Sequence, residues 1–213
     1  MKKRILCFGD SNTWGAIPQE TNRYADDVRW TGVLALKLGE GYTVIEEGHN
    51  GRTTVWDDPV EDRLSGVTYF CACIDSQSPL DLIVLMLGTN DLKTRYGVKA
   101  DTVAYGLRRY NGALTTTPMA GEKPEVLLVS PLLIDPSYKD NALFHDMFGE
   151  DATERSKKFA TAYKALADEM GWHYMDASQY AKASTRDGLH MEAEGHTSLG
   201  NAIADKVFEI LKK

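Results

Sequence analysis

The sequence has few cysteines, and they do not form a metal-binding pattern. Its three cysteines, an odd number, do not suggest a disulfide framework. Cys7 lies within an apolar run and is expected to be a buried, small apolar side chain. Cys71 and Cys73 form a C-x-C pair, a spacing that does not match zinc sites. We therefore predict no metal and a reducing environment.

The sequence has no apolar run that approaches the length of a membrane-spanning helix. Basic residues open the chain in the manner of a signal peptide. However, only four apolar residues follow before Gly9, too few for the hydrophobic region of such a peptide. These absences predict a cytoplasmic protein with no membrane partner.

A basic patch is also missing. The formal net charge of -7 favours solubility and argues against a nucleic-acid partner. Pairs of basic residues at 108–109 and 157–158 are expected on solvated helix faces. With 213 residues, 43% of them hydrophobic and 26% charged, the chain is predicted to form one globular domain over residues 1–213.

What the sequence does contain is an alternation of strand-like and helix-like stretches. Short apolar runs predict strands at 5–8, 42–46, 82–87, 126–129 and 172–175. Apolar residues at helical spacing predict helices at 28–38, 63–74, 101–116, 151–170 and 192–211, with Asp101 as a cap. This alternation predicts an α/β fold whose parallel sheet is covered by helices on both faces.

One connection is unusually long. The segment 132–150 lies between the fourth strand and the fourth long helix, and loops of this length generally carry a function or are disordered. It contains Pro136, Tyr138, Phe144, Met147 and Phe148, and its aromatic residues argue against disorder. We expect a lid over a site or a contact between subunits.

Small polar residues follow three of the predicted strands. They are Gly9-Asp10-Ser11-Asn12-Thr13-Trp14-Gly15, Asn50-Gly51-Arg52-Thr53 and Gly88-Thr89-Asn90-Asp91. Ligands of open α/β sheets bind at the carboxyl ends of the strands, so these segments are expected to converge on one site. Near the end of the chain, Asp187-Gly188-Leu189-His190 adds a base and a carboxylate. A serine hydroxyl becomes a strong nucleophile when a histidine takes its proton and a carboxylate orients that histidine.

Each residue also has a structural interpretation. Ser11 can be a turn or helix-cap residue, Asn90 a helix cap, and Gly51 a turn glycine. Asp187 and His190 can form a solvated turn before the last helix. Two other histidines compete for the role of base: His49 follows an acid by three residues, and His196 lies farther along the last helix, where it is expected to face solvent or core.

Together these segments resemble the conserved blocks of the SGNH hydrolases, also called the GDSL family. Ser11 matches the serine of block I, Gly51 the glycine of block II and Asn90 the asparagine of block III, while Asp187 and His190 match block V. The longer signature Gly-Asp-Ser-Asn-Thr-Trp-Gly, with Arg29-Trp30 and Gly-Thr-Asn-Asp downstream, is similar to the small arylesterase and acyltransferase branch. One departure is Asn12, where the family nickname expects leucine, and it bears on specificity rather than on the chemistry.

The resemblance implies a flavodoxin-like three-layer α/β/α sandwich with a five-stranded parallel sheet in the order 2-1-3-4-5. It also implies that Ser11 is the nucleophile, His190 the base and Asp187 the orienting carboxylate. The oxyanion would be bound by the backbone N–H groups of Ser11 and Gly51 and by the side-chain amide of Asn90. No cofactor is implied, and relatives in this branch suggest a homo-oligomer.

Two residues beside the nucleophile are candidates for contact with the substrate. Asp10 precedes Ser11 in the sequence, and it could alternatively be the second carboxylate of a glycosidase pair or accept hydrogen bonds from the turn. Trp14 follows Ser11 by three residues, and it either forms a wall of the pocket or packs against the first helical turn.

The leading functional hypothesis is a serine esterase acting on small or aryl carboxylic esters, with acyl transfer to alcohols as a second activity. One alternative is a carbohydrate O-acetyl esterase, which would use the same residues. An alternative from another class is a nucleotide- or flavin-binding module, because residues 9–13 resemble a phosphate-binding loop at a helix start. The sequence lacks G-x-G-x-x-G and a P-loop lysine, and that alternative would leave Asp187 and His190 without a role.

Overall fold

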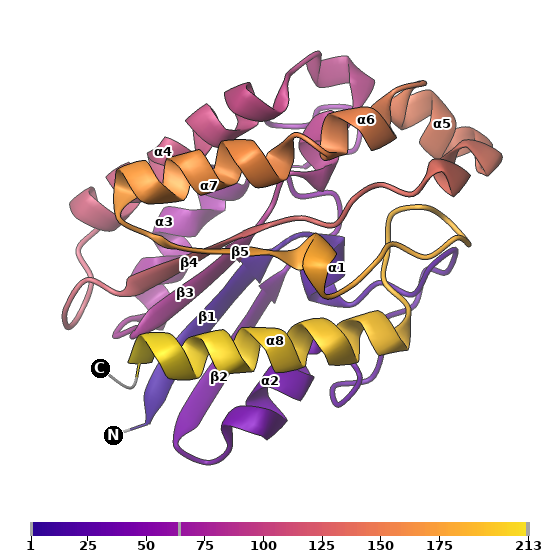
Figure 1. Cartoon of the computed structure of the whole chain (residues 1–213). Helices are drawn as coiled ribbons and strands as arrows, with labels where there is room; N and C mark the ends of the chain where they lie inside the picture. The colour runs from indigo at the N-terminus through magenta and orange to yellow at the C-terminus, as the bar shows by residue number, and fades with distance from the viewer. Residues whose placement is uncertain (1, 64, 212–213) are drawn as a thin grey trace.

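Five parallel strands form the centre of the protein in a computed structural model that describes residues 2–63 and 65–211. The sheet has the order β2-β1-β3-β4-β5, as predicted (Figure 1). The strands are β1 Lys3–Gly9, β2 Tyr42–Gly48, β3 Leu82–Met86, β4 Glu125–Ser130 and β5 His173–Asp176.

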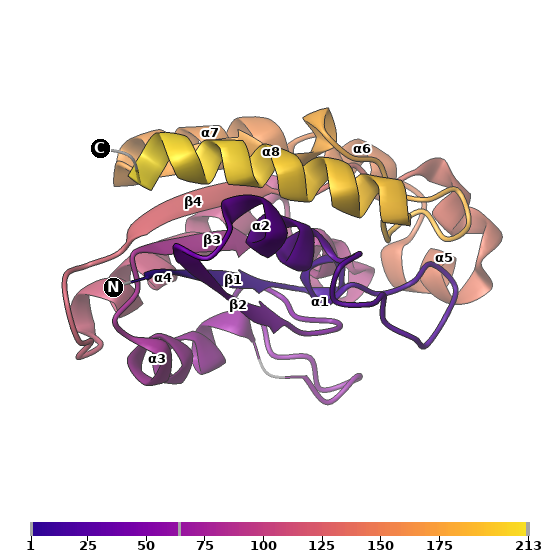
Figure 2. The same cartoon turned by 90° about the horizontal axis from the view of Figure 1, so that it is seen from below.

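Helices cover both faces of this sheet, which gives the predicted three layers (Figure 2). One face carries α2 Trp30–Leu38 and α8 Ala193–Leu211, which pack against each other. The other face carries α3 Gly66–Gln77, α4 Ala100–Thr116 and α7 Phe159–Met170. The shorter helices are α1 Ser11–Trp14, α5 Ala142–Phe148 and α6 Ala152–Ser156.

The sequence of β1 explains why the sheet is covered twice. Ile5 and Cys7 pack into the core beneath α2 and α8, whereas Leu6 and Phe8 pack into the core beneath α3, α4 and α7. All four side chains are fully buried. Alternate residues of a strand point to opposite faces, so a strand buried on both faces is apolar throughout. Burial of each large apolar side chain contributes about 1.5–3 kcal/mol.

Several predicted boundaries differ from the structure. The predicted helix 151–170 is two helices, α6 and α7, and the buried Ser156 ends the first of them. The Ser156 hydroxyl donates to the Thr153 carbonyl at 2.7 Å and accepts the backbone N–H of Ile134 at 3.1 Å, bonds that compete with a continuous helix. Lys99, rather than Asp101, is the N-cap of α4, and Asp101 lies in its first turn.

Strand and helix ends were predicted less well than their centres. β2 extends two residues beyond the predicted 42–46, and β5 spans His173–Asp176 rather than 172–175. The predicted helix 63–74 begins at Gly66, and position 64 within that prediction lies outside the described residues. The ends of helices and strands are decided by caps and tertiary contacts rather than by apolar spacing.

The segment 132–150 is folded, not a loop. A 3₁₀ turn, Pro136–Asp140, leads into α5. Tyr138 is fully buried, its hydroxyl donates to the Gly149 carbonyl, and it accepts the backbone N–H of Ala152 at 3.3 Å. The segment is thereby anchored at both ends, with α5 between. In the part of the chain that the structure describes, no helix has the length and apolar character required to cross a bilayer.

Candidate active site

Ser11 stands at the carboxyl edge of the sheet because β1 ends abruptly at Gly9. A Cβ at position 9 would lie 2.0 Å from Thr13 Oγ1 and 2.7 Å from the Met86 carbonyl, so only glycine allows this turn. Asp10 is the N-cap of α1, and its carboxylate accepts the backbone N–H of Asn12 at 3.0 Å. The turn therefore presents Ser11 at the first position of a short helix.

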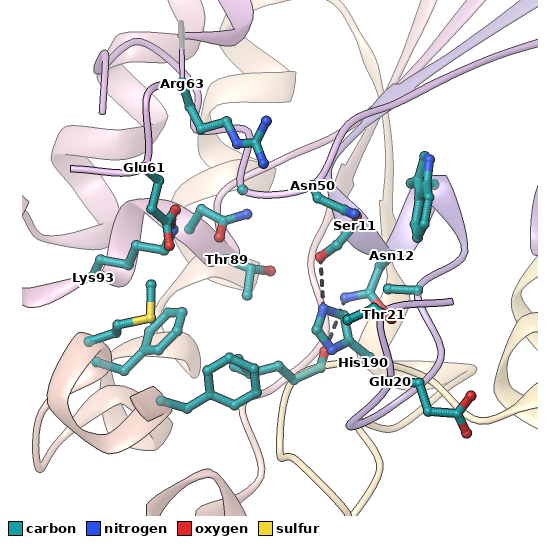
Figure 3. Close-up of a pocket in the computed structure, with 18 residues that line it drawn as sticks. Ser11, Asn12, Glu20, Thr21, Asn50, Glu61, Arg63, Thr89, Lys93 and His190 are labelled. Carbon is teal, nitrogen blue, oxygen red and sulfur yellow. Dashed lines mark hydrogen bonds and ion pairs between the residues drawn. The ribbon is translucent and has the colours of Figure 1, made fainter. Parts of the chain in front are cut away.

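His190 connects Ser11 to a buried carboxylate. Its Nε2 lies 2.9 Å from Ser11 Oγ, and its Nδ1 lies 2.8 Å from Asp187 Oδ2 (Figure 3). The Asp187 side chain has no exposed surface, and its Oδ1 accepts the backbone N–H groups of Leu189 and His190. Burial alone would raise the pKa of Asp187, but the hydrogen bond and charge of His190 and the backbone N–H groups of Leu189 and His190 together outweigh it and lower that pKa. The carboxylate is therefore held in its charged form beside the imidazole.

The loop that carries His190 is fastened to α1 by Asn12. The Asn12 side chain donates to the Leu189 carbonyl at 3.0 Å and accepts the backbone N–H of Met191 at 3.1 Å. These two bonds bracket His190 and join residues that are far apart in the sequence. The departure from the family leucine at position 12 thus has a positioning role that the sequence did not suggest.

Gly51 and Asn90 come from the turns after β2 and β3, and they reach the same cavity as Ser11 and His190. Gly51 has a φ of +76°, a left-handed conformation that favours glycine. Asn90 lies inside a 3₁₀ turn, Thr89–Leu92, whose N-cap is Gly88, so it is not the helix cap considered as an alternative. Its Nδ2 donates to the Arg52 carbonyl at 3.1 Å, which directs the carboxamide into the cavity wall.

Two buried charged residues support these turns, and the sequence analysis gave neither of them a role. Arg52 donates to the Gly9 carbonyl at 2.9 Å, and its guanidinium lies 4.2 Å from the centre of the Phe8 ring. Asp91 accepts hydrogen bonds from Thr54 and is fully buried, which raises its pKa to about 7. Arg52 directly follows Gly51, and Asp91 directly follows Asn90. Their position next to motif residues was the signal by which the sequence could have indicated a role for them.

The cavity has a volume of about 410 Å³, at the lower end of the range for small-molecule sites. Glu20 and Thr21 lie on one side of Ser11 (Figure 3), and Trp14 also lines the cavity. Glu61, Arg63 and Lys93 form a second wall, away from Glu20 and Thr21 (Figure 3). The lining also includes Phe144, Met147 and Phe148 of the 132–150 segment. The charged residues of this second wall were not predicted.

The remaining predicted residues lie as follows. Trp14 lines the cavity, and the Arg23 guanidinium lies 5.3 Å from its ring centre. Asp10 is 2% exposed and is absent from the described cavity lining, in contrast to the prediction that it contacts the substrate. It serves instead as the turn acceptor, and burial raises its pKa to about 6. A glycosidase pair with Asp10 is therefore not formed at the cavity.

The competing histidines have other partners. His196 is fully buried within α8, where its Nδ1 accepts the backbone N–H of Trp30 at 3.3 Å. His49 does not pair with Glu46 among the described interactions, since Glu46 binds Arg29 at 2.6 Å. Of the described residues, no group of three or more His, Cys, Asp or Glu side chains is placed to hold a metal ion.

A hydroxyl, an imidazole and a buried carboxylate are hydrogen-bonded in series at the carboxyl edge of a parallel sheet. This arrangement is found in hydrolytic enzymes. Residues 7–197 match the model of the GDSL-like lipase/acylhydrolase family, and the chain belongs to this family. This match confirms the resemblance found in the motifs.

Solved structures of esterases superpose on the whole chain. A carbohydrate acetylesterase from Sinorhizobium meliloti is 41% identical, with a TM-score of 0.91 and coverage of 99% of this chain and 100% of that one. The aryl esterase of M. smegmatis is 38% identical, with a TM-score of 0.92 and coverage of 98% and 100%. A second carbohydrate acetylesterase family member from S. meliloti is 34% identical, with a TM-score of 0.93 and coverage of 99% and 100%. A search of curated proteins found no match.

The family and these neighbours define the protein as an esterase-type hydrolase, an enzyme that hydrolyses esters. They give no support to a nucleotide- or flavin-binding module.

Proposed function

We propose that the protein is a serine esterase that hydrolyses small or aryl carboxylic esters through an acyl-enzyme on Ser11. The observation that carries the proposal is the distance of 2.9 Å between Ser11 Oγ and His190 Nε2. Asp187 on the other side of the imidazole ring, at 2.8 Å, completes the chain of proton transfer and charge stabilisation.

The proposed reaction begins when Ser11 Oγ attacks the ester carbonyl and His190 Nε2 takes the hydroxyl proton. The carbonyl oxygen becomes negatively charged, and the backbone N–H groups of Ser11 and Gly51 and the Asn90 amide donate hydrogen bonds to it. His190 then gives its proton to the departing alcohol as the carbon–oxygen bond breaks. Water, deprotonated by His190, attacks the acyl group, and the proton returns to Ser11 as the acid leaves.

The size and composition of the cavity support small substrates. A volume of about 410 Å³ walled by Trp14, Phe144, Met147 and Phe148 favours a short acyl chain and an aromatic or small leaving group. The similarity to an esterase named for aryl substrates supports the same class. We further propose that an alcohol replaces water in the second step, which gives acyl transfer. Acyl transfer is measured as the ester formed when the alcohol is supplied with the acyl donor.

A carbohydrate O-acetyl esterase is the second candidate. Two similar structures are described as carbohydrate acetylesterases, and Glu20, Thr21 and Lys93 provide polar side chains on the cavity wall. The two candidates share the catalytic step and differ only in the leaving group. Rates on acetylated xylo-oligosaccharides and on aryl acetates, measured side by side, separate them.

The location and assembly of the protein remain predictions. We expect it in the cytoplasm as a homo-oligomer, with the 132–150 segment at a subunit contact or acting as a lid. Leu143 on α5 is 64% exposed beside the cavity-lining Phe144, which supports a contact there. Sedimentation of wild type and Leu143→Glu tests it, and equal, monomeric masses would exclude the contact.

Covalent labelling tests the nucleophile. A sulfonyl fluoride is expected to add one label, on the peptide that contains Ser11, with loss of activity. Ser11→Ala is expected to lose both the label and the turnover. Ser198→Ala, which changes an exposed serine of α8, is expected to keep both. Full turnover in Ser11→Ala, or a label on another serine, would refute the proposed mechanism.

A further inference from the structure

One cationic side chain of the cavity wall has no anionic partner among residues 2–63 and 65–211. Arg63 lines the cavity, and its side chain reaches toward Asn50 (Figure 3). A Cβ placed on Gly51 would lie 3.2 Å from Glu61 Oε2 and 3.7 Å from Arg63 Nε, so both side chains lie beside the glycine whose N–H is proposed to bind the oxyanion. None of the ion pairs formed by residues 2–63 and 65–211 includes Arg63.

The neighbouring charges already balance one another. Asp58 binds Arg95 at 2.6 Å and Lys93 at 3.7 Å. Glu61 binds Lys93 closely and Arg95 at 3.3 Å. Two carboxylates thus meet two cations, and Arg63 lies outside these ion pairs.

The backbone of Arg63 is fixed by a turn of the chain. Its backbone N–H donates to the Asp58 carbonyl at 2.9 Å, and its carbonyl accepts the Asp58 N–H at 2.7 Å. The turn between them is fixed by the Asp58 carboxylate, which accepts the backbone N–H groups of Val60 and Glu61 at 3.1 and 3.3 Å. The backbone from which the Arg63 side chain extends is therefore fixed, and its planar guanidinium has the geometry that matches a carboxylate.

A second polar group on the same wall is also unused. The side-chain Oδ1 of Asn50 is buried and has no hydrogen-bond partner in the described part of the chain, although Asn50 lines the cavity next to Gly51. A buried polar atom without a partner costs free energy unless a ligand or water satisfies it. Because this oxygen only accepts hydrogen bonds, it suits a donor on the substrate or a water molecule, and the donors for an anion come from Arg63.

We propose that Arg63 binds a carboxylate on the acyl part of the substrate, so that the enzyme prefers monoesters of short dicarboxylic acids. This inference rests on the proposed esterase function and specifies its substrate class. Figure 3 shows Arg63 and His190 on different sides of the Ser11 hydroxyl. Because His190 must protonate the departing alcohol, the leaving group lies on its side, and the acyl group extends toward Arg63. A guanidinium binds a carboxylate through two parallel N–H···O bonds.

A matched pair of esters tests the proposal. Monoethyl succinate carries the carboxylate, and ethyl succinamate has nearly the same shape with a neutral amide in its place. Wild type is expected to show a higher kcat/KM for monoethyl succinate. In Arg63→Gln, the ratio of the two kcat/KM values is expected to fall about 10- to 100-fold, the range for a charge-assisted hydrogen bond, and mainly through KM. Arg63→Lys is expected to restore part of the ratio, because it returns the charge without the planar fork.

The controls separate this site from general effects. Arg109→Gln, which changes an exposed arginine on α4, is expected to leave the ratio unchanged. The wild-type preference is expected to decline with added salt, because ionic screening weakens the attraction. Melting curves of each variant exclude unfolding as the cause of a lost preference.

Three outcomes would overturn the proposal. An equal loss of kcat on both esters in Arg63→Gln would place the guanidinium at the oxyanion instead. A wild type that does not discriminate between the esters would remove the carboxylate site. A preference only for an acetate ester whose alcohol carries the carboxylate would put the anion on the leaving-group side. In each case loss of turnover in Ser11→Ala would still support the esterase mechanism, so the two proposals can fail separately.

Discussion

The carboxylate of Asp91 accepts the backbone N–H of Thr54 at 3.0 Å through one oxygen and at 3.1 Å through the other, and it also accepts the Thr54 hydroxyl. Asp91 directly follows Asn90, and Thr54 follows Gly51 by three residues. These bonds join the turn after β2 to the turn after β3. The fully buried Asp91 carboxylate therefore fixes the position of Gly51 relative to Asn90, the two proposed oxyanion donors other than Ser11.

Asp91→Ala is expected to lower both stability and kcat. Removal of the carboxylate leaves the buried Thr54 N–H without an acceptor, which costs about 1–3 kcal/mol. The turns would then move relative to each other, and kcat is expected to fall with little change in KM. Asp91→Asn keeps one acceptor oxygen and is expected to retain more of both. Urea melts and steady-state kinetics on the two variants test this, and unchanged kcat in Asp91→Ala would show that this link between the turns is not needed for turnover.

Asp187→Asn is expected to fold and to lose most of its turnover. The amide oxygen can still accept the backbone N–H groups of Leu189 and His190, but it supplies no negative charge beside the imidazole. The expected loss in kcat is about 10⁴-fold, the size seen when a triad aspartate becomes asparagine. Turnover of an aryl acetate is measured beside a melting curve. Near wild-type kcat in a folded variant would remove Asp187 from the mechanism.

Asn90→Ala is expected to reduce kcat about 10²- to 10³-fold, the range for loss of one oxyanion donor. KM is expected to change much less, because the oxyanion exists only beyond the bound substrate. Asn201→Ala, which removes a helix-surface amide on α8 that donates to Thr197, provides the matched control. If Asn90→Ala lowers the melting temperature while kcat persists, the carboxamide only supports the Arg52 carbonyl.

His196→Asn is expected to flatten the pH dependence of stability between about pH 6.5 and 4. Burial lowers the pKa of His196 to about 4, whereas the unfolded chain takes up this proton near pH 6.5. The contribution of neutral His196 is therefore complete above pH 6.5, and up to about 3 kcal/mol is lost as the pH falls toward 4. Asparagine can still accept the Trp30 N–H but does not titrate in this range.

Urea melts at a series of pH values measure this change as the difference between wild type and His196→Asn. Asp10 and Asp91 act in the opposite direction, because their raised pKa values of about 6 and 7 make the folded state take up protons first. They are present in both proteins and cancel in the difference. If the free energy of unfolding depends on pH in the same way in both proteins, His196 does not contribute to the pH dependence of stability.

The amino-acid sequence by itself determined the order of strands and helices, and the residues at the ends of the first three strands. Apolar runs buried on both faces, such as Leu82–Met86, are a local property of the chain. The turns behind Ser11, Gly51 and Asn90 rely on glycine and on short polar side chains, which are also visible locally. For these reasons, and because the motifs resemble a family, the sheet order and the central residues of the site could be predicted.

Only the tertiary structure decided which side chains surround those residues. Asn12 binds the His190 loop, and Asp10 caps a helix instead of lining the cavity. Arg63 lines the cavity and has no ion-pair partner among the described residues. Each of these roles depends on contacts between segments far apart in the chain, and apolar spacing carries no information about such contacts. The division of 151–170 into α6 and α7 has the same origin, since the Ser156 hydroxyl bonds to Ile134. Local sequence sets the strands and turns, and long-range packing sets the partners of the polar side chains that they carry.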